Sequence, residues 1–299
     1  MADQRPMVCF AEPLGSSDHR AVSVLGFEDF DPLPMHSIEA VIHAVSTTPG
    51  LFGVMPIENS TEGELTLSID RLIFESEMAY IIGEAVLGEP IWAFSTAEEG
   101  EIRDVVSHAM ILDLSASFIQ QHGLRTHHAV STAAACQRVV GGQFPGMVAL
   151  APPTVGYSFG LVPIETEVMK VPEIRTRYAL IGKEVPEPSG DDRTMLVVAP
   201  RTDAVGALEE IAGLFAANGV NMYSIVSRPL ALLPEFHCFV IGAEGHVYEE
   251  PVLKLVRALV EAGHGVKLIG SFPRWRRSEV VNPSLTLPKG MINLTDLAR

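Results

Sequence analysis

Polar side chains gather directly behind a short apolar run near residue 57. The run 53–57 is strand-like, and Glu58, Asn59, Ser60 and Thr61 follow it without a break. Ligand clefts of α/β folds form at the carboxyl ends of strands, so these amide and hydroxyl groups are placed to hold a ligand that carries a carboxylate. The same residues also fit a polar turn that leads into a helix capped at Ser60 or Thr61.

Two more groups of hydroxyl-bearing residues occur later in the chain. Ser131 and Thr132 stand at the start of a predicted helix, capped by one of them, where free backbone NH groups can bind an anion. Thr176 precedes Arg177 and Tyr178. A hydroxyl at Thr176 can donate to a leaving oxygen, whereas Arg177 fits a substrate-binding cation and a purely structural ion pair equally well.

Composition argues against several classes of function. The 37 acidic and 21 basic side chains give a net charge of -16, which repels a phosphate backbone, so nucleic acid is not an expected partner. No apolar run of about 18 residues occurs, so no membrane span is expected. The first residues lack the apolar stretch of a signal peptide, and the expected location is therefore cytoplasmic. Neither the three cysteines nor the histidines have metal-binding spacing, so no metal site is expected.

The order of apolar runs predicts two unlike parts of the chain. From Val8 to Val168 strand-like runs alternate with helix-like segments, which indicates an α/β fold with sheets covered by helices. Within it, Ser107 to Gly123 predicts a strand end and one helix. Around Val185 the sequence changes to VPEPSGDD, which indicates a domain boundary. The remainder predicts the βαββαβ order of a ferredoxin-like fold, with strands at 194–200, 221–230, 236–246 and 265–272 and helices at 205–219 and 249–263.

Two features of this C-terminal module suggest a ligand site. Gly206 precedes a helix and leaves backbone NH groups free for a carboxylate, and Ser227-Arg228-Pro229 ends a strand with a cation and a rigid residue. Taken singly, each is ordinary turn or edge chemistry. Together, the segments VGALEEIAGLFAANGVNMYSIVSRPL, FVIGAEGH and VKLIGSFPR resemble the ACT domain attached to prephenate dehydratases.

The resemblance to an ACT domain implies regulation by an amino acid, which in that family is phenylalanine bound at a subunit interface. Val226 departs from the pattern, which has Glu before Ser-Arg-Pro, so the identity of the effector stays open. Such modules usually pair across a two-fold axis, which implies a homodimer or homotetramer. The implied effector-binding residues are Gly206, Ala207, Leu208, Asn221, Ser227, Arg228 and Pro229.

The N-terminal motifs are similar to the catalytic domain of the same family, and they occur in its order. PIENSTEG, STAAA, Gly160-Leu161 and Thr176-Arg177-Tyr178 correspond to the family's PIENS…G, STAAA, YGL and TRF motifs. The resemblance implies a two-lobed α/β catalytic domain like that of type 2 periplasmic binding proteins over residues 6–183. An ACT domain over 193–275 and a C-terminal extension over 276–299 would follow.

The implied reaction is the conversion of prephenate to phenylpyruvate, CO2 and water, for which no cofactor is required. The implied catalytic residues are Thr176, Arg177 and Ser16. The implied substrate-binding residues are Glu58, Asn59, Ser60, Ser131, Thr132, His108 and Tyr178.

Departures from the family pattern leave two alternatives open. Residues 12–18, EPLGSSD, stand for the family's GPEGTFS, so Ser16 keeps a hydroxyl while Ser17 replaces an aromatic residue. Ala109-Met110 replaces a Pro-Gln pair. Changes at residues that shape the fate of the ring hydroxyl fit a relative that decarboxylates prephenate and keeps that hydroxyl. The alternative of another class is a non-enzymatic amino-acid sensor.

Overall fold

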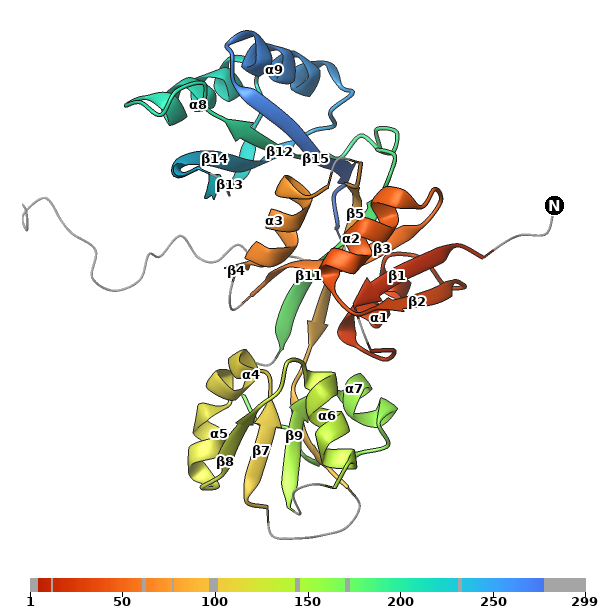
Figure 1. Ribbon diagram of the computed structural model, residues 1–299. Helices are drawn as coiled ribbons and strands as arrows, with labels where there is room; N and C mark the ends of the chain where they lie inside the picture. The colour runs from red at the N-terminus through yellow and green to blue at the C-terminus, as the bar shows by residue number, and fades with distance from the viewer. Residues whose placement is uncertain are drawn as a thin grey trace, which may run out of the picture.

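The computed structural model describes residues 5–11, 13–60, 63–76, 78–96, 102–142, 146–169, 173–230 and 233–276. These residues form three stacked units, with an N-terminal lobe in the middle, a second lobe below it and the C-terminal module above (Figure 1). The proposed C-terminal extension lies, apart from Arg276, outside the described residues. Among the described residues, no helix is long and apolar enough to cross a membrane.

Lobe 1 is built on a sheet whose central strand comes from a distant part of the chain. Strands β1, β2 and β3 are parallel, and β11 inserts antiparallel between β3 and β5. Helix α1 covers one face, and α2 and α3 cover the other. The elements of lobe 1 are β1 (Met7–Ala11), α1 (Ser17–Val24), β2 (Asp31–Met35), α2 (Ile38–Thr47), β3 (Phe52–Asn59), β4 (Gly63–Glu64), α3 (Thr66–Phe74), β5 (Tyr80–Glu89) and β11 (Ile174–Gly182).

Lobe 2 is a five-stranded sheet in the order β10-β6-β9-β7-β8, with an apolar cluster on each face. The single helix predicted between Ser107 and Gly123 is wrong, because the chain breaks at Ser115 into two short helices. The elements of lobe 2 are β6 (Trp92–Ser95), β7 (Asp104–Ser107), α4 (Ala109–Leu114), α5 (Ala116–Gln121), β8 (Arg125–His128), α6 (Thr132–Val140), β9 (Met147–Ala151), α7 (Pro153–Ser158) and β10 (Val162–Glu165).

The C-terminal module has the predicted βαββαβ order. Its strands are arranged β13-β14-β12-β15, the order of a ferredoxin-like sheet, so the expected fold class is confirmed. Helices α8 and α9 cover the face that points away from lobe 1 (Figure 1). The elements are β12 (Asp192–Ala199), α8 (Ala207–Ala217), β13 (Met222–Leu230), β14 (Leu233–Glu244), α9 (Glu250–Glu261) and β15 (Gly265–Pro273).

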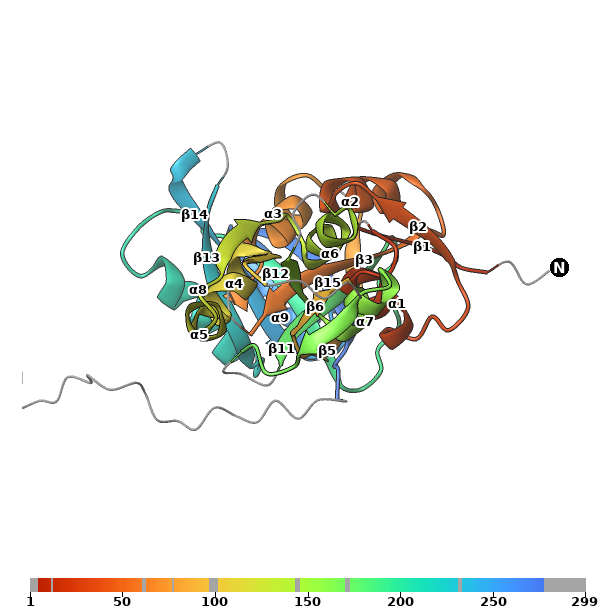
Figure 2. The same cartoon turned by 90° about the horizontal axis from the view of Figure 1, so that it is seen from below.

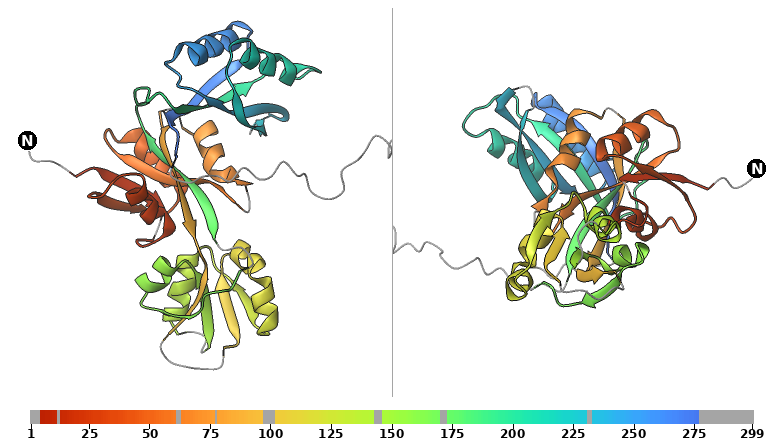
Figure 3. Two further views of the ribbon diagram at one scale, coloured as in Figure 1. Left: turned by 180° about the vertical axis from the view of Figure 1, so that it is seen from behind. Right: turned by 60° about the horizontal axis from the view of Figure 1, so that its bottom comes forward.

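The C-terminal module and lobe 1 share both a sheet and a core. Strand β15 pairs in parallel with β5 at Gly270 and Ile81, so one sheet continues through both units in the described chain. The apolar cluster beneath α3 contains Leu72 of lobe 1 together with Val197 and Phe272 of the C-terminal module. Seen from behind, α3 lies against the sheet of the C-terminal module (Figure 3). A movement of the C-terminal module would therefore displace residues of lobe 1 as well.

Gly270 allows the backbones of β15 and β5 to approach each other closely. A Cβ at this position would lie 2.2 Å from the carbonyl oxygen of Ile81, a backbone atom that cannot move alone. We expect Gly270→Ala to lower the free energy of unfolding by about 1–3 kcal/mol, measured as a lower urea midpoint. Gly213→Ala is the matched control, because nothing lies within 4 Å of its Cβ position on α8. That control should gain up to about 1 kcal/mol from helix propensity. Equal midpoints for the two variants would contradict the close approach.

Candidate active site

The carboxyl ends of several strands of lobe 1 meet at one edge. Strands β1, β2, β3 and β5 run in the same direction, since β3 and β5 are both antiparallel to β11. They therefore end together, at Ala11, Met35, Asn59 and Glu89. Helix α1 begins near the same edge, because only a short turn separates it from β1. This is the edge at which α/β sheets hold ligands.

Lobe 2 presents its corresponding edge to lobe 1. Strands β7, β8 and β9 are parallel and end at Ser107, His128 and Ala151. Trp92 of β6 pairs with Ala151, and β6 directly continues β5 after Glu89. The two edges consequently face each other, and in the view from below α7 of lobe 2 lies over α1 of lobe 1 (Figure 2).

Direct contacts join the two lobes at this edge. The guanidinium of Arg20, on α1, donates to Thr154 Oγ1 of α7 at 3.1 Å and forms an ion pair with Glu89 of β5. The hydroxyl of Thr154 also lies 3.4 Å from Glu89. Gly15 approaches α7 so closely that a Cβ would lie 3.0 Å from Ser158 Oγ. Contacts between α1 and α7 thus hold the two facing edges together on this side.

A β-bulge in β3 determines the direction in which the polar side chains at the end of β3 point. Across from β11, Tyr178 pairs with Pro56, while Arg177 pairs with Glu58, so Ile57 has no opposite residue. The extra residue reverses the alternation of side chains along β3. As a result Asn59 lies opposite Thr176 on one face, and Glu58 lies opposite Arg177 on the other.

The face that carries Thr176 is the α1 face. Tyr178, two residues further along β11, packs with Phe10 and Val22 beneath α1 and is buried. Its hydroxyl contacts Ser17 and Asp18 in the first turn of α1. Burial raises the pKa of Tyr178 well above its usual value, so the phenol stays protonated. Thr176, Asn59 and the start of α1 therefore face the space between the lobes.

The face that carries Arg177 is turned toward α3 and the C-terminal module. Its guanidinium lies 2.8 Å from Glu58 and 3.4 Å from Glu84, whose side chain is fully buried. Burial by itself lowers the pKa of Arg177. The carboxylates of Glu58 and Glu84 outweigh this effect, so the pKa of Arg177 is raised overall. Of the two roles predicted for Arg177, the structure displays the ion pair.

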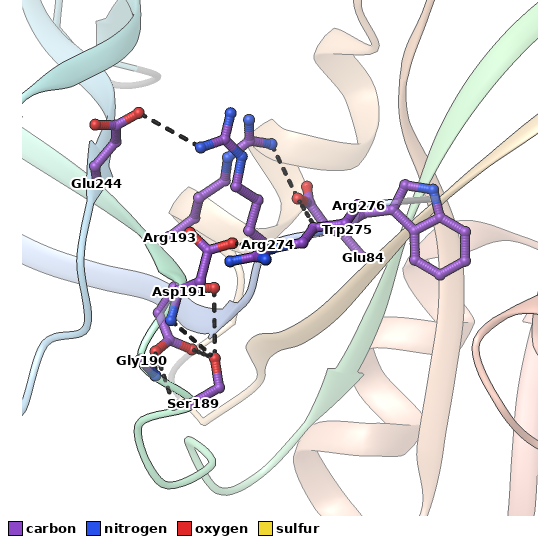
Figure 4. A network of polar contacts seen from close by, with 10 residues as sticks. Glu84, Ser189, Gly190, Asp191, Arg193, Glu244, Arg274, Trp275 and Arg276 are labelled. Atoms are coloured by element: carbon purple, nitrogen blue, oxygen red, sulfur yellow. Dashed lines mark hydrogen bonds and ion pairs between the residues drawn. The ribbon is translucent and has the colours of Figure 1, made fainter. Parts of the chain in front are cut away.

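Glu84 joins lobe 1 to the C-terminal module. Besides Arg177, its carboxylate accepts from Arg193 of β12 at 2.9 Å and from the backbone N–H of Trp275 at 3.1 Å (Figure 4). The guanidinium of Arg193 stacks over the ring of Tyr223, 4.4 Å from its centroid. Two cations and a backbone donor compensate the buried charge. The strand that carries Thr176 is thereby tied to the C-terminal module.

Three of the predicted hydroxyls have backbone partners. Ser16 caps α1 by accepting from the N–H of His19 at 3.3 Å, and Ser131 caps α6 by accepting from Ala134 at 3.1 Å, as predicted. Ser60 is exposed and accepts from the N–H of Arg175 at 3.1 Å. A hydroxyl that accepts in this way still has its own proton to donate to a ligand.

His108 and Thr132 are half-buried and stand at the starts of α4 and α6, on the lobe 2 edge. Ser131 and Thr132 belong to the N-terminus of α6, where the first backbone NH groups of a helix can bind an anion. The structure thus gathers Thr176, Asn59, Ser16, Ser131, Thr132 and His108 at the facing edges and separates them from Glu58 and Arg177.

Sequence reasoning missed three acids at or behind this edge. Glu89 ends β5 at the edge and Glu84 lies behind β11, and neither belongs to a motif singled out from the sequence. Asp18 lies in the segment 12–18, but it was not predicted as a site residue. Their spacing along the chain gives no signal, because their partners are distant in sequence. Glu84 pairs with Arg177, 93 positions away, and Glu89 pairs with Arg20, 69 positions away. Within the described ranges, no group of three or more His, Cys, Asp or Glu side chains could hold a metal ion.

The predicted effector residues lie along α8 and β13, and most are exposed. Gly206 adopts a positive φ of 92° before α8, a conformation that favours glycine. Asn221, Ser227, Pro229 and Leu208 are exposed, whereas Ala207 and Arg228 are half-buried. Arg228 reaches into lobe 1, where its Nε lies 2.9 Å from Asp70 Oδ1 on α3 and a second nitrogen pairs with the other carboxylate oxygen. Asp70 raises the pKa of Arg228.

Comparison with known proteins agrees with this architecture. Residues 8–186 match the family model described as prephenate dehydratase. The chain belongs to the prephenate dehydratase family. A prephenate dehydratase of Amycolatopsis methanolica is 30% identical over 89% of this chain and 88% of its own length. A bifunctional chorismate mutase/prephenate dehydratase of Aquifex aeolicus is 28% identical over 91% of this chain and 75% of its own.

A solved structure of the family has a similar arrangement. A prephenate dehydratase from Arthrobacter aurescens, in complex with L-Phe, superposes with a TM-score of 0.81, 26% identity and 90% coverage of each chain. Such coverage reaches beyond lobes 1 and 2 into the C-terminal module. The family to which the motifs pointed is therefore confirmed, and with it the assignment of the chain to the lyases.

Proposed function

We propose that this chain converts prephenate to phenylpyruvate, CO2 and water. The observation that carries the proposal is the pairing of Thr176 with Asn59, which unites the family's two principal motifs at the edge between the lobes. Helix N-termini at Ser131 and Thr132 lie across from them and suit a carboxylate. Prephenate bears two carboxylates, so anion-binding groups from both lobes match its charge.

The proposed chemistry needs positioning and a proton source rather than a cofactor. Breaking the bond to the ring carboxylate leaves its electron pair in the ring, and expulsion of the hydroxyl group then completes the aromatic system. Thr176 is placed to donate a hydrogen bond to the departing oxygen, and Asn59 and Ser16 to hold the substrate. A partly dry cleft favours loss of CO2, since water would stabilise the carboxylate.

A product assay tests the proposal directly. The purified chain is mixed with prephenate, and phenylpyruvate is followed by its absorbance in alkali. Its appearance supports the dehydratase. A non-aromatic keto acid that keeps the hydroxyl would instead assign the chain to the decarboxylases. Unchanged prephenate, together with a rise in melting temperature on addition of phenylalanine, would leave only an amino-acid sensor.

Thr176→Ala tests the proposed donor. We expect kcat to fall by at least about tenfold, because the hydroxyl acts on the departing oxygen, while the melting temperature stays close to wild type. Thr176→Ser should retain much of the activity. Wild-type turnover in the alanine variant would exclude Thr176 from the reaction.

The β-bulge predicts unequal effects for two adjacent residues. Asn59 faces the cleft, so Asn59→Ala should raise KM or lower kcat enough to reduce kcat/KM by at least about tenfold. Glu58 lies on the opposite face, and Glu58→Gln preserves the shape of its side chain. This variant should change KM for prephenate by less than about twofold. Steady-state kinetics of both variants provide the measurement. A larger loss for Glu58→Gln than for Asn59→Ala would reverse the assignment of faces.

We further propose that the C-terminal module is an ACT domain that binds an amino acid, with L-phenylalanine as the first candidate. The solved relative from Arthrobacter aurescens was obtained in complex with L-Phe. Exposed apolar side chains occur among the implied effector residues and next to them in the chain: Leu208, Val205 and Ile225. Ile225 lies on the edge strand β13, and exposed apolar side chains on an edge strand are suited to burial by a second subunit, which supports a homodimer or homotetramer.

Helix α3 offers a physical route from this module to the catalytic edge. Arg228 holds Asp70 in its middle, and Lys267 of β15 donates to the carbonyls of Leu72 and Ile73 at 2.9 and 2.7 Å near its C-terminus. Helix α3 follows the short strand β4, which comes after β3, and β3 ends at Asn59. A change in β13 on effector binding would therefore shift α3 and, through it, the polar residues at the end of β3.

Asp70→Asn tests this route. We expect the variant to turn over prephenate and to keep its L-Phe-induced melting shift, but to need several-fold more L-Phe for half-inhibition, because Arg228 no longer holds α3. Glu250→Gln is the control, since it removes an exposed ion pair with Lys254 on α9 that touches no catalytic element. Undiminished inhibition of the Asp70→Asn variant would show that the signal takes another path.

A further inference from the structure

A second polar cluster at the cleft edge has no part in the chemistry described so far. Asp18 stands in the first turn of α1, beside the buried hydroxyl of Tyr178 and near the carboxylate of Glu89. It occupies the position where the family pattern GPEGTFS ends in Ser. The cluster lies where α1, β5 and β11 come together and where Arg20 and Thr154 join the two lobes.

The two carboxylates of this cluster are held very differently. Glu89 accepts from Ser17 Oγ, pairs with the guanidinium of Arg20 and contacts Thr154, so its negative charge is compensated. Asp18 has the hydroxyl of Tyr178 as its polar contact and sits close to the charge of Glu89. Burial, with a further contribution from Glu89, raises the pKa of Asp18 to about 7 despite the opposing hydrogen bond from Tyr178. A carboxylic acid that keeps its proton near neutrality is a proton donor.

Asp18 is on the same side of the sheet as Thr176. Thr176 and Tyr178 are two residues apart on β11, about 7 Å along the strand, and both face α1. A ring bound against Thr176 and Asn59 would thus lie within reach of the first turn of α1. This placement is independent of the acidity of the group.

We propose that Asp18 is the catalytic acid that protonates the leaving ring hydroxyl, an inference that rests on the proposed dehydratase activity. As the carbon–carbon bond to the ring carboxylate breaks, its electron pair enters the ring and CO2 departs. The carbon–oxygen bond breaks, and the proton of Asp18 goes to the departing oxygen to give water. Asp18 is left as a carboxylate and recovers its proton from solvent before the next turnover. Thr176 then orients the oxygen rather than protonating it.

Several charged and titratable groups surround Asp18, and each could contribute to the pH dependence of prephenate turnover. Glu89 faces it from β5, Tyr178 from β11, and Arg20 lies on its own helix. His19, the next residue, accepts from the N–H of Gly15 at 3.0 Å and stacks on Phe10, 4.8 Å between ring centroids. Burial lowers the pKa of His19, so this imidazole loses its proton at a lower pH than an ordinary histidine does. Loss of activity above neutral pH is therefore assigned to Asp18.

The test is the pH dependence of prephenate turnover by the full chain. For the wild type, kcat/KM should fall about tenfold per pH unit above about pH 7, because the active form is protonated. Asp18→Asn should lose about 100-fold or more in kcat and lack this alkaline limb. Asp31→Asn is the matched control, an exposed aspartate at the opposite end of β2, and should keep both the rate and the limb.

A stability measurement separates catalysis from folding. The folded-state pKa of Asp18 lies above its unfolded value, so its contribution to stability is present at low pH and is lost as pH rises through about 7. Asp18→Asn should consequently melt at or above the wild-type temperature at pH 8 and gain less at pH 5. A folded, slow variant without the alkaline limb supports the proposal.

The outcomes distinguish this inference from the function on which it rests. If the wild type forms no phenylpyruvate from prephenate, the proposed dehydratase activity is wrong and the acid with it. If the wild type is active and Asp18→Asn keeps the same alkaline limb or loses less than about threefold in kcat, the dehydratase stands and Asp18 is not its acid.

Discussion

The insertion of β11 between β3 and β5 is the constraint on which this structure depends. The chain leaves lobe 1 through β5, forms lobe 2, and returns through β11, so two antiparallel strands join the lobes and fix their edges opposite each other. Both neighbours of β11 contribute to the site, with Asn59 on β3 and Glu89 at the end of β5. Without this strand, the polar groups of lobe 1 would have no shared face.

The two-residue period of β11 divides its side chains between the proposed catalytic face and the face that contacts the C-terminal module. Thr176 and Tyr178 face α1 and the cleft, and Arg177 between them faces Glu84 and the C-terminal module. A rigid strand cannot shift one face alone. Displacement of Arg177 by the module above would therefore move Thr176, and the buried carboxylate of Glu84 makes such a displacement costly because its two cations would be separated.

Two acids, Glu84 and Asp18, illustrate how environment assigns different roles to one kind of group. Glu84 is surrounded by Arg177, Arg193 and a backbone N–H, so its charge is compensated and it ties elements together. For Asp18, burial is the main factor that raises the pKa and favours the neutral form; the charge of Glu89 adds to it, and the hydrogen bond with Tyr178 opposes it. Charge pairing makes Glu84 a structural link, whereas burial favours the protonated form of Asp18 on which its proposed role as an acid rests.

The family, the α/β class, the βαββαβ order of the C-terminal module and a cap of α6 at Ser131 or Thr132 could be predicted from the sequence, because these follow from short motifs and local periodicity. Folding was needed to reveal that a bulge at Ile57 turns Asn59 toward Thr176 and Glu58 away from it. It also assigned Arg228 to Asp70 and placed Asp18 beside Tyr178. Such pairings join residues more than a hundred positions apart, and hydrogen bonding and burial at that range leave no periodic trace in the chain.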